Sequence, residues 1–441
     1  MNKQKWIDRA RELGVPDLEI YEELSEERRV AWFNGQMDSF VTSSVLGTSI
    51  RAVVDGKAAN IALEAVDDEK MDETIAALLE QARLVSSKDI ETLREPEATD
   101  EVRSRTEWIR PSMEEIREKL AAVEKECLAA DPRVRQVTEI GWEEAGRSRE
   151  ITNSRGVHVS DDSRSQVLYA GVAAEENGEV KNGFHIAVVP DLAAAKPEEL
   201  AAETVQDALD ELGGKPVPSG KYPVILERRA MTSLFSALTD MFSGDLIGKG
   251  LSPLKDAADT AVFSELITVV DDPKNTDCLN VANYDDEGCP TRRKVLVDKG
   301  IFRQALHNTK SAARMGTQST GNGFRQGYAG AVSVRPMNCC VLPGEKSLDA
   351  LQAEMGDGLV ITQLAGLHAG LNHVTTDFSL QCSGYVVKNG KRERSAALIT
   401  IAGNFLDLMK KVTAVGSDLD WEYRTVACPS ILFSSCAIAG E

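Results

Sequence analysis

The chain has 441 residues, 42% hydrophobic and 27% charged, which is typical of a globular protein with room for two or three domains. Its 50 basic and 70 acidic residues give a formal net charge of −20, so the chain as a whole repels polyanions and no nucleic-acid partner is expected. Residues 1–13 have the pattern of a short amphipathic helix and not of an apolar leader, and no later stretch has the roughly 18 apolar residues of a membrane span. We therefore expect a cytoplasmic protein without a membrane partner.

The first half of the chain contains a weak internal repeat. Residues 18–61 and 134–183 have the same order of short alternating or β-branched runs, which are separated by turn residues. Asn34-Gly35, Asp55-Gly56, Arg155-Gly156 and Asn177-Gly178 are typical of tight hairpins, because glycine, asparagine and aspartate tolerate the positive φ angles that such turns require. Each copy of the repeat is predicted to form a small antiparallel meander.

Three helices are predicted around these meanders. Asp67 is a suitable N-cap for a helix whose apolar residues share one face up to Val85. Ser112 and Glu115 have the spacing of a capping box, and a third helix is expected to begin near Pro197. The apolar stripes of all three helices are interpreted as core-facing.

A segment rich in Gly and Pro, residues 213–223, suits neither a helix nor a central strand. We place the domain boundary there, which gives an N-terminal α+β domain over residues 1–215 and a C-terminal β-rich domain over residues 216–441. In the second domain, helices are expected near residues 230–242, 347–355 and 404–414, and strand-like runs cover residues 262–271, 293–298, 359–362, 374–387 and 396–401. The predicted fold class is α+β, with helices and two antiparallel meanders in the first domain and a β-rich second domain.

Specific segments of the second half carry a resemblance to a known family: Thr268–Pro273, Tyr284–Arg293, Val374–Ser379, and Ile401–Asp407 followed by Val415–Asp418. With these segments in this order, the chain resembles the TldD/PmbA family over nearly its whole length, more weakly in the first half. The resemblance implies two domains, a C-terminal domain on a strongly twisted sheet, and a dimer that encloses a cavity. In the catalytic branch of the family, two histidines of a His-Glu-x-x-x-His run and a downstream cysteine hold a zinc that hydrolyses unfolded peptides.

At the positions of that zinc motif the chain carries Phe235, Ser236 and Asp240. Zinc needs lone pairs from imidazole, thiolate or carboxylate, together with an open position for water. Phe235 has no lone pair, Asp240 alone is one ligand of three, and Ser236 cannot replace the glutamate as a general base. The chain therefore resembles the non-zinc branch, called PmbA or TldE, which implies no catalytic residue, no metal and no cofactor of its own.

A relocated metal site is an alternative. His368, His373 and Cys382 are the best remaining cluster of soft ligands, although Gly366 and Gly370 favour a loop. Cys428 lies loosely where the catalytic branch has its ligand cysteine, but its context is typical of a strand, so we assign it no ligand role. Eight cysteines in 441 residues are too few for a disulfide scaffold, and reduced, mostly buried thiols are expected.

Two further segments leave alternatives open. Asp285-Asp286-Glu287 can bind a hard cation or form a salt-bridged turn with Arg292 and Arg293. The Gly-rich segment Ser319–Arg325 lacks the helix and the lysine of a phosphate-binding loop. We interpret it as a mobile loop that lines the cavity.

The resemblance implies a function in proteolysis. The chain is predicted to be a non-zinc subunit that pairs with a zinc-bearing TldD-type subunit and shapes a cavity for unfolded peptides, with zinc only in that partner. The residues expected to line the cavity are Asp245, Asn322, Asp377 and Ser379. The alternatives are a homodimeric peptide-binding protein without catalysis and a metallopeptidase with the relocated site, so whether the chain is itself an enzyme stays open.

Overall fold

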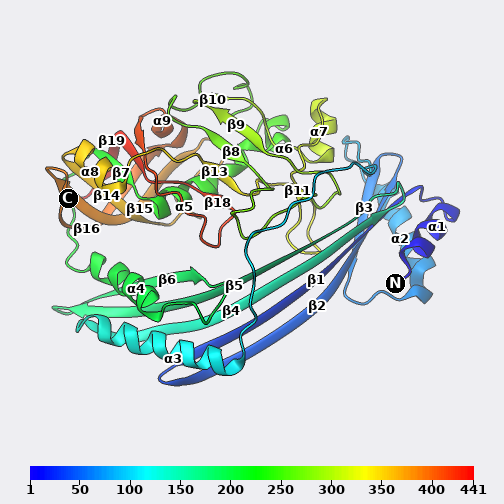
Figure 1. The fold of residues 1–441 in the computed structure, drawn as a ribbon. Helices are drawn as coiled ribbons and strands as arrows, with labels where there is room; N and C mark the ends of the chain where they lie inside the picture. The colour runs from blue at the N-terminus through cyan, green and yellow to red at the C-terminus, as the bar shows by residue number, and fades with distance from the viewer.

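The computed structural model describes residues 1–441, and Figure 1 shows a long curved sheet from the first half of the chain with the second half packed inside its curve. This sheet is antiparallel throughout and has the strand order β3-β2-β1-β4-β5-β6. Its strands are β1 Asp17–Phe33, β2 Gln36–Val54, β3 Lys57–Leu63, β4 Val134–Asn153, β5 His158–Glu176 and β6 Glu179–Val188. The two predicted meanders are confirmed, and they meet where β1 pairs with β4.

The internal repeat is an α–β–β–β–α unit that occurs twice, because each meander has a helix before it and another after it. These helices are α1 Lys3–Glu12, α2 Met71–Leu84, α3 Met113–Ala130 and α4 Pro197–Glu211. The turns at Asn34-Gly35, Asp55-Gly56 and Asn177-Gly178 have positive φ at both residues, as predicted for tight hairpins. The capping box of Ser112 and Glu115 is also confirmed.

The strands of the repeat are longer than the sequence indicated. The predicted short runs merge, and β1 continues without a break through the charged segment Glu22–Arg29. Every residue of this segment pairs with β2 on one side and with β4 on the other. Because both edges of the strand are hydrogen-bonded, local turn preferences are overridden and the charged side chains lie on the two faces.

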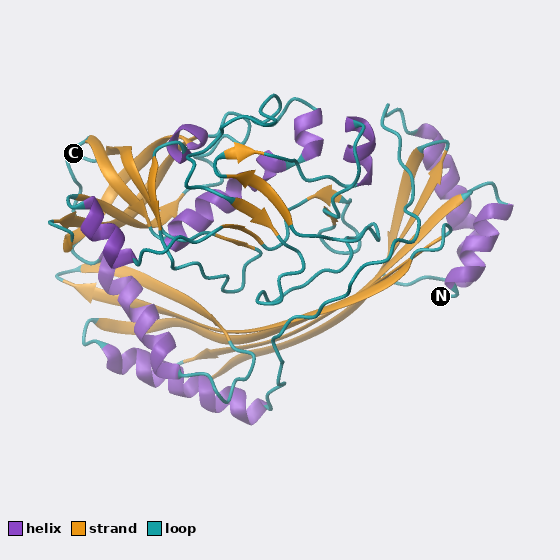
Figure 2. Cartoon of the chain, turned by 45° about the horizontal axis from the view of Figure 1, so that its top comes forward, coloured by secondary structure: helices purple, strands orange, loops and turns teal.

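The four helices cover the convex face of the sheet (Figure 2). One apolar core lies between α1, α2 and residues such as Ile20, and another lies between α3, α4 and residues such as Val30 and Trp142. Side chains alternate between the two faces of a strand, so the concave face carries a different set of residues. It includes Glu19 and Arg51, which are buried against the second half of the chain.

The second half contains further sheets around a large apolar core. The first sheet has the order β16-β15-β14-β7-β19-β17, and an additional pairing of β16 with β19 closes it on itself. The second sheet has the order β10-β9-β8-β13-β18, and β11 and β12 form a separate pair. The strands of the second half are β7 Gly220–Leu226, β8 Val269–Asp271, β9 Lys294–Asp298, β10 Ile301–Phe302, β11 Gly323–Phe324, β12 Ser333–Val334, β13 Cys339–Val341, β14 Gly358–Ala365, β15 Asp377–Lys388, β16 Lys391–Asn404, β17 Val412–Val415, β18 Val426–Ala427 and β19 Ile431–Ala439. Its helices are α5 Arg228–Leu238, α6 Gly244–Gly248, α7 Thr309–Met315, α8 Leu348–Met355 and α9 Phe405–Met409. The predicted α+β class is confirmed.

Three element predictions in the second half need correction. The Gly- and Pro-rich segment extends into β7, and Pro223 is tolerated there because β14 pairs with β7 only from Val224 onward and the pairing with β19 is irregular at this point. The strand expected over 262–271 is confined to β8, and the helix expected over 404–414 ends at Met409. The domain boundary after residue 215 stays a prediction.

Residues 85–112, which we call the strap, contain no helix and no strand and connect α2 to α3. The strap runs along the second half of the chain before it reaches α3 (Figure 1). Val102 exchanges two hydrogen bonds of 2.9 Å with the side chain of Asn283, and Lys274 donates to Thr99 and to the carbonyl of Asp100. These bonds fix the strap against the second half.

No helix of the protein has both the length and the apolar character that crossing a membrane requires. All eight cysteines are buried and unpaired, as expected for reduced thiols.

Candidate functional site

The helix predicted over residues 230–242 is α5, followed by a 3-10 turn over Thr239–Phe242. Glu227 caps α5, since its carboxylate accepts a hydrogen bond of 2.9 Å from the backbone N–H of Arg229. At the other end, Gly244 at the start of α6 donates its N–H to the carbonyl of Leu306 at 2.8 Å. The segment that carries the motif positions is therefore fixed at both ends.

The motif positions lie on two different sides of this segment. Phe235 is fully buried, and its ring centroid lies 6.3 Å from that of Phe242 and 6.4 Å from that of Phe405. Ser236 and Asp240 are exposed. Phe235 is thus part of the apolar core, and the three positions do not converge on one point as a ligand set must.

Cys428 lies closer to the motif helix than the sequence indicated. Its backbone N–H donates to Oγ1 of Thr232 on α5 at 2.9 Å, and that hydroxyl contacts the carbonyl of Cys428 at 3.3 Å. The thiol itself belongs to the apolar core, and burial raises its pKa well above the usual range. Because the thiolate is the form that binds metal, this environment opposes a ligand role.

The donor set at the motif does not fit zinc, because only Asp240 offers a suitable oxygen there. The relocated site is not formed either: His368 and His373 are exposed, whereas Cys382 is a core residue of β15. No group of three or more His, Cys, Asp or Glu side chains is arranged to hold a metal ion.

A cavity of about 360 Å³ lies beside the motif segment and brings Asp240 and Asp245 together. Its opposite wall includes Lys310 and Arg335. Asp245 pairs with Arg314 at 2.6 Å, and with Lys249 of its own helix end at 2.7 Å. Burial opposes the ionised form of Asp245, but the two cations lower its pKa below the usual value. The cavity keeps charged and hydrogen-bonding groups although the zinc ligands are missing.

His307 supports this cavity from the core side. A Cβ atom at Gly244 would lie 2.1 Å from the imidazole ring, so the close approach of the two residues requires glycine. The ring is buried, and its Nδ1 lies 3.2 Å from Oγ of Ser311. Burial lowers the pKa of His307, so the side chain is held neutral.

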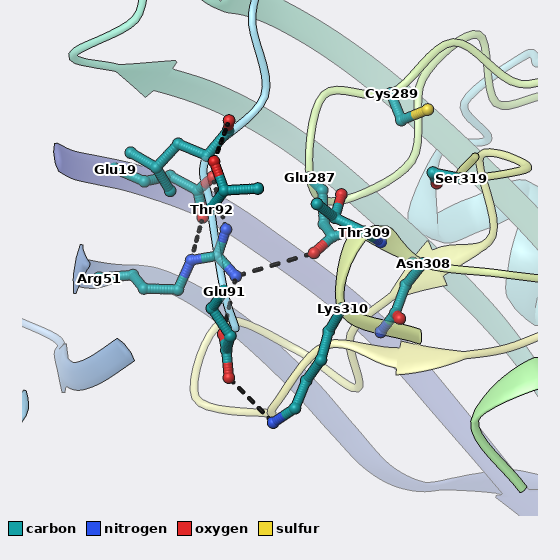
Figure 3. A network of polar contacts seen from close by, with 12 residues as sticks. Glu19, Arg51, Glu91, Thr92, Glu287, Cys289, Asn308, Thr309, Lys310 and Ser319 are labelled. Carbon is teal, nitrogen blue, oxygen red and sulfur yellow. Dashed lines mark hydrogen bonds and ion pairs between the residues drawn. The ribbon is translucent and has the colours of Figure 1, made fainter. Parts of the chain in front are cut away.

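A band of buried and half-buried ion pairs, which we call the polar seam, joins the concave face of the sheet to the second half of the chain. It consists of Glu19, Arg51, Glu91, Arg147, Arg149, Asp286, Glu287, Lys310 and Arg325. Figure 3 shows Arg51 among three carboxylates, of which Glu19 lies at 3.2 Å and Glu287 at 3.8 Å. Apart from the acidic turn at residues 285–287, sequence motifs do not indicate this seam, because its members are distant in sequence.

The acidic turn at residues 285–287 is a structural part of the seam. Asp286 is fully buried and pairs with Arg149 and Arg147 of β4, not with Arg292 or Arg293 as expected. Burial opposes its ionised form, yet the two arginines lower its pKa below the usual value. Protein donors occupy this carboxylate, so the turn is salt-bridged, but the predicted partners Arg292 and Arg293 are wrong. The three acidic residues are not arranged as a group that could hold a metal ion.

Arg325 anchors the Gly-rich segment to the sheet. Its guanidinium donates to Glu19 at 3.1 Å and to Ser49 at 3.0 Å, and lies 4.9 Å from the ring centre of Tyr21. Its backbone N–H donates to Asp286 at 2.7 Å. The segment is therefore held in place and is not the mobile loop that the sequence suggested.

Asn322 is the centre of this held segment. Its amide N–H₂ donates to Asp271 and to the carbonyl of Arg335, both at 2.9 Å, and its oxygen accepts from Lys294 and Thr320 at 2.8 Å. The residue is fully buried. Asn322 consequently has no free polar atom for a peptide, in contrast to its predicted role.

The strap connects the motif cavity to the polar seam. Asp89 pairs with Arg314, which also holds Asp245, and Glu91 pairs with Lys310 at 2.9 Å. Neither cation of α7 is indicated by the sequence, because isolated Lys and Arg residues belong to no motif. The cavity is thus lined by residues of the second half of the chain, two of which, Asp245 and Lys310, are linked to the strap by ion pairs.

The remaining predicted cavity residues lie elsewhere. Asp377 and Ser379 are exposed on β15, and Asn404 and Thr375 donate to the carboxylate of Asp377 at 2.9 and 2.7 Å. These bonds lower the pKa of Asp377. Asp377 and Ser379 do not line the cavity of Asp245. Contact with peptide stays a prediction for Asp245, Asp377 and Ser379.

Further hollows lie between β4, β5, the strap and the loop around Val281. Cavities of about 640, 260 and 350 Å³ share lining residues, among them Ser163, which lines all three. Their walls combine charged residues such as Asp162 with apolar ones such as Leu279. This mixture suits a polypeptide, which offers both backbone groups and side chains.

Replacing Asp286 by asparagine is expected to lower the free energy of unfolding by about 3–5 kcal/mol, because the buried guanidinium of Arg149 loses its main partner. Urea denaturation followed by tryptophan fluorescence measures this change. The matched control is Asp277→Asn, which removes an ion pair to Arg105 of the strap with side chains 67% and 76% exposed. This control substitution is expected to lower the free energy of unfolding by about 0–1 kcal/mol. Equal effects of the two variants would contradict the role of the seam.

His307 is expected to make stability depend on pH. Its folded pKa is lowered, so below about pH 6.5 the unfolded chain binds a proton that the folded chain does not, and stability is lost as the pH falls. His307→Gln removes this contribution, which has a slope of at most about 1.4 kcal/mol per pH unit. Denaturation curves between pH 7.5 and 5 measure the difference from wild type. His373→Gln, at an exposed site, is the control and should leave the profile unchanged.

Three family profiles match successive parts of this fold. Residues 18–85 match the PmbA/TldA metallopeptidase domain 1, residues 107–212 the central domain, and residues 219–440 the C-terminal domain. The C-terminal profile alone covers half of the chain.

Individual proteins agree with these profiles. Metalloprotease PmbA of Escherichia coli O157:H7 is 28% identical over 333 residues, which are 75% of this chain and 71% of that protein. A metalloprotease of Methanocaldococcus jannaschii is 24% identical over 432 residues, or 95% and 93% of the two chains. The crystal structure of TldE from Thermococcus kodakarensis matches with a TM-score of 0.90 and 25% identity over 99% of this chain and 100% of that one. The chain belongs to the PmbA/TldD metallopeptidase family.

Proposed function

We propose that this chain is the non-zinc subunit of a two-subunit peptidase, in which a zinc-bearing relative supplies catalysis and this chain helps to form the compartment for unfolded peptides. The observation that carries the proposal is the burial of Phe235 at a zinc-ligand position. A core residue at that position is incompatible with a metal ligand, whereas the rest of the family fold is kept. The similarity to a protein named TldE supports the same assignment.

Two features support a role in holding peptide. The connected cavities along β5 and the strap offer both charged and apolar walls, and the cavity at Asp245 keeps charged groups of both signs. An extended peptide satisfies its backbone groups by hydrogen bonding along such walls, with little dependence on its sequence. The proposed location is cytoplasmic, and the proposed substrates are unfolded peptides.

A homodimeric peptide-binding protein without catalysis is the second candidate function. The observation that favours it is an open, apolar strand edge on β2 that this chain itself leaves uncovered. Both candidates predict peptide capture by the isolated chain. They differ in whether adding a zinc-bearing partner leads to cleavage of the peptide, which only the first candidate predicts.

Peptide cleavage by purified proteins tests the proposal. The chain alone is expected to give no chelator-sensitive cleavage of an unfolded peptide, since no residue at the motif activates water. The chain mixed with a His-Glu-x-x-x-His relative from the same cell is expected to cleave it. Chelator-sensitive cleavage by the chain alone would overturn the proposal, and a mixture no faster than the relative alone would favour the second candidate.

The connected cavities can be tested separately from catalysis. Ser163→Trp places a large ring where the three cavities meet and is expected to weaken binding of a fluorescently labelled unfolded peptide at least about tenfold, or 1.4 kcal/mol. Fluorescence anisotropy measures the affinity. The control is Ser434→Trp at an exposed position of β19, and equal affinities of the two variants would place the peptide elsewhere.

A further inference from the structure

A cavity of about 500 Å³, which we call the acidic cavity, lies between α4, β6 and the sheet of the second half. It shares no lining residue with the cavities described above. Figure 1 shows α4 between the curved sheet and the second half of the chain. The volume lies within the range of small-molecule sites, roughly 300–1,000 Å³.

The walls of the acidic cavity are held together by polar bonds between the two halves of the chain. Three of them start on α4 and end on α5, β16 and β15: Asp207 to Arg229 at 2.8 Å, Asp210 to Arg392 at 2.8 Å, and Glu211 to Ser383 at 3.1 Å. Because each bond reaches a different element, the cavity has its shape before any ligand enters.

Negative charge exceeds positive charge in this cavity. Two guanidinium groups line it, and so do the carboxylates of Glu203, Asp207, Asp210, Glu211 and Glu227. Arg229 pairs with Asp207 and lies 3.4 Å from Glu203, and Arg392 pairs with Asp210. Both cations are therefore already paired, and the cavity has no free cation to receive an anionic ligand.

Two of the carboxylates lack a cation of their own. Glu211 forms no ion pair and only accepts the hydrogen bond from β15. Glu227 lies 3.6 Å from Nε of Arg228, whose guanidinium is closer to Glu422, at 2.9 Å. Burial raises the pKa of Glu227 above its usual value. A cation bound in the cavity would stabilise the ionised form of both carboxylates.

Tyr385 supplies an independent indication of a ligand. Its side chain is 8% exposed, its ring packs in an apolar cluster with Leu351, and Cζ of Arg392 lies 4.7 Å from the ring centre. Burial raises the pKa of Tyr385 to about 12, and the charges that act on the hydroxyl include Arg392, Glu227 and Asp210, which line the acidic cavity. The hydroxyl faces these residues and has no hydrogen-bond partner in the chain. Buried hydroxyls are normally hydrogen-bonded, so this one lacks a partner that a ligand can supply.

The lining defines the chemistry of the ligand. The carboxylates are not arranged as a group that could hold a metal ion, so the cation that fits is an organic one with N–H donors. Phe184, Leu348 and Leu364 add apolar surface to the same cavity. Such surface suits the aliphatic stem of an amine, whose charged end needs the carboxylates.

We propose that the acidic cavity binds a small aliphatic amine, whose ammonium or guanidinium group donates hydrogen bonds to Glu211, Glu227 and the hydroxyl of Tyr385. The inference does not depend on the proposed function, because the acidic cavity is separate from the cavities assigned to peptide.

Isothermal titration calorimetry of the purified full-length chain tests the proposal. The probes are 1,5-diaminopentane and agmatine, which carry an ammonium group or a guanidinium group on an aliphatic chain. Saturable binding of one molecule per chain is expected for at least one of them, and no binding is expected for 1,5-pentanediol, which has the same length as the diamine and no charge. Absence of binding by both amines would overturn the proposal. Binding of an acetylated tetralysine amide but of neither amine would make a basic side chain of another protein the occupant and would also overturn it.

Substitutions separate the cavity from general attraction to an acidic chain. Tyr385→Phe keeps the ring and Glu211→Gln keeps an acceptor for Ser383, so the melting temperature without ligand should be unchanged. Each is expected to weaken amine binding about tenfold, because each removes an acceptor for a charged donor. The matched control is Glu198→Gln, which removes the same charge at an exposed position of α4 outside the cavity and should leave the affinity unchanged. Unchanged affinity in either cavity variant, or equal weakening by Glu198→Gln, would overturn the proposal.

Discussion

The balance of buried charge between the sheet and the second half of the chain is the constraint on which the remaining structure depends. Removing ions from water is costly, so each buried carboxylate or guanidinium requires a partner in good geometry. Here the partners lie on opposite sides of the contact: Arg149 from β4 meets Asp286, and Arg325 meets Glu19 of β1. The relative placement of the two halves follows, because a displacement would leave these charges unpaired. Through Glu91 and Lys310 the same balance extends to the wall of the motif cavity.

The two zinc-ligand positions of the family motif differ in burial in this chain: Phe235 lies in the apolar core, whereas Asp240 lies on the surface. Phe235 packs within about 6.4 Å of Phe242 and Phe405, so a histidine there would exchange aromatic packing for an imidazole that needs hydrogen-bond partners. The neighbouring cavity nevertheless keeps Asp245 in an ion pair that reaches the strap through Arg314. A motif segment whose residues do not form a zinc-ligand set, beside a cavity with a charged wall, fits the proposed role of a subunit that shapes a compartment.

Local sequence signals predicted local structure well. Asn-Gly and Asp-Gly turns, the capping box at Ser112 and the order of the two meanders all follow from interactions between residues close in sequence. Strand length was underestimated in β1, because pairing on both sides decides whether a charged run such as Glu22–Arg29 stays extended. The same limit applies to Asn322, whose glycine neighbours suggested a mobile loop, whereas buried partners from three other elements hold it.

The candidate site likewise contains residues that the sequence indicates and residues that it does not. The identity of the motif positions was readable from sequence, since the family pattern fixes them, and so was the place of Phe235 on an apolar stripe. The sequence does not indicate the ion pairs of Lys310 and Arg314 with the strap carboxylates, because these contacts join residues more than 200 positions apart. Long-range electrostatic pairing leaves no periodic trace in the sequence.

The zinc content of the purified, dialysed protein after incubation with excess zinc shows whether this chain has a zinc site of its own, and elemental mass spectrometry measures it. Near-zero zinc per chain is expected, because Phe235, the exposed Asp240 and the buried Cys428 do not form a ligand set. One zinc per chain, retained after dialysis, would require ligands outside the motif segment and would overturn the assignment of this chain as a non-zinc subunit.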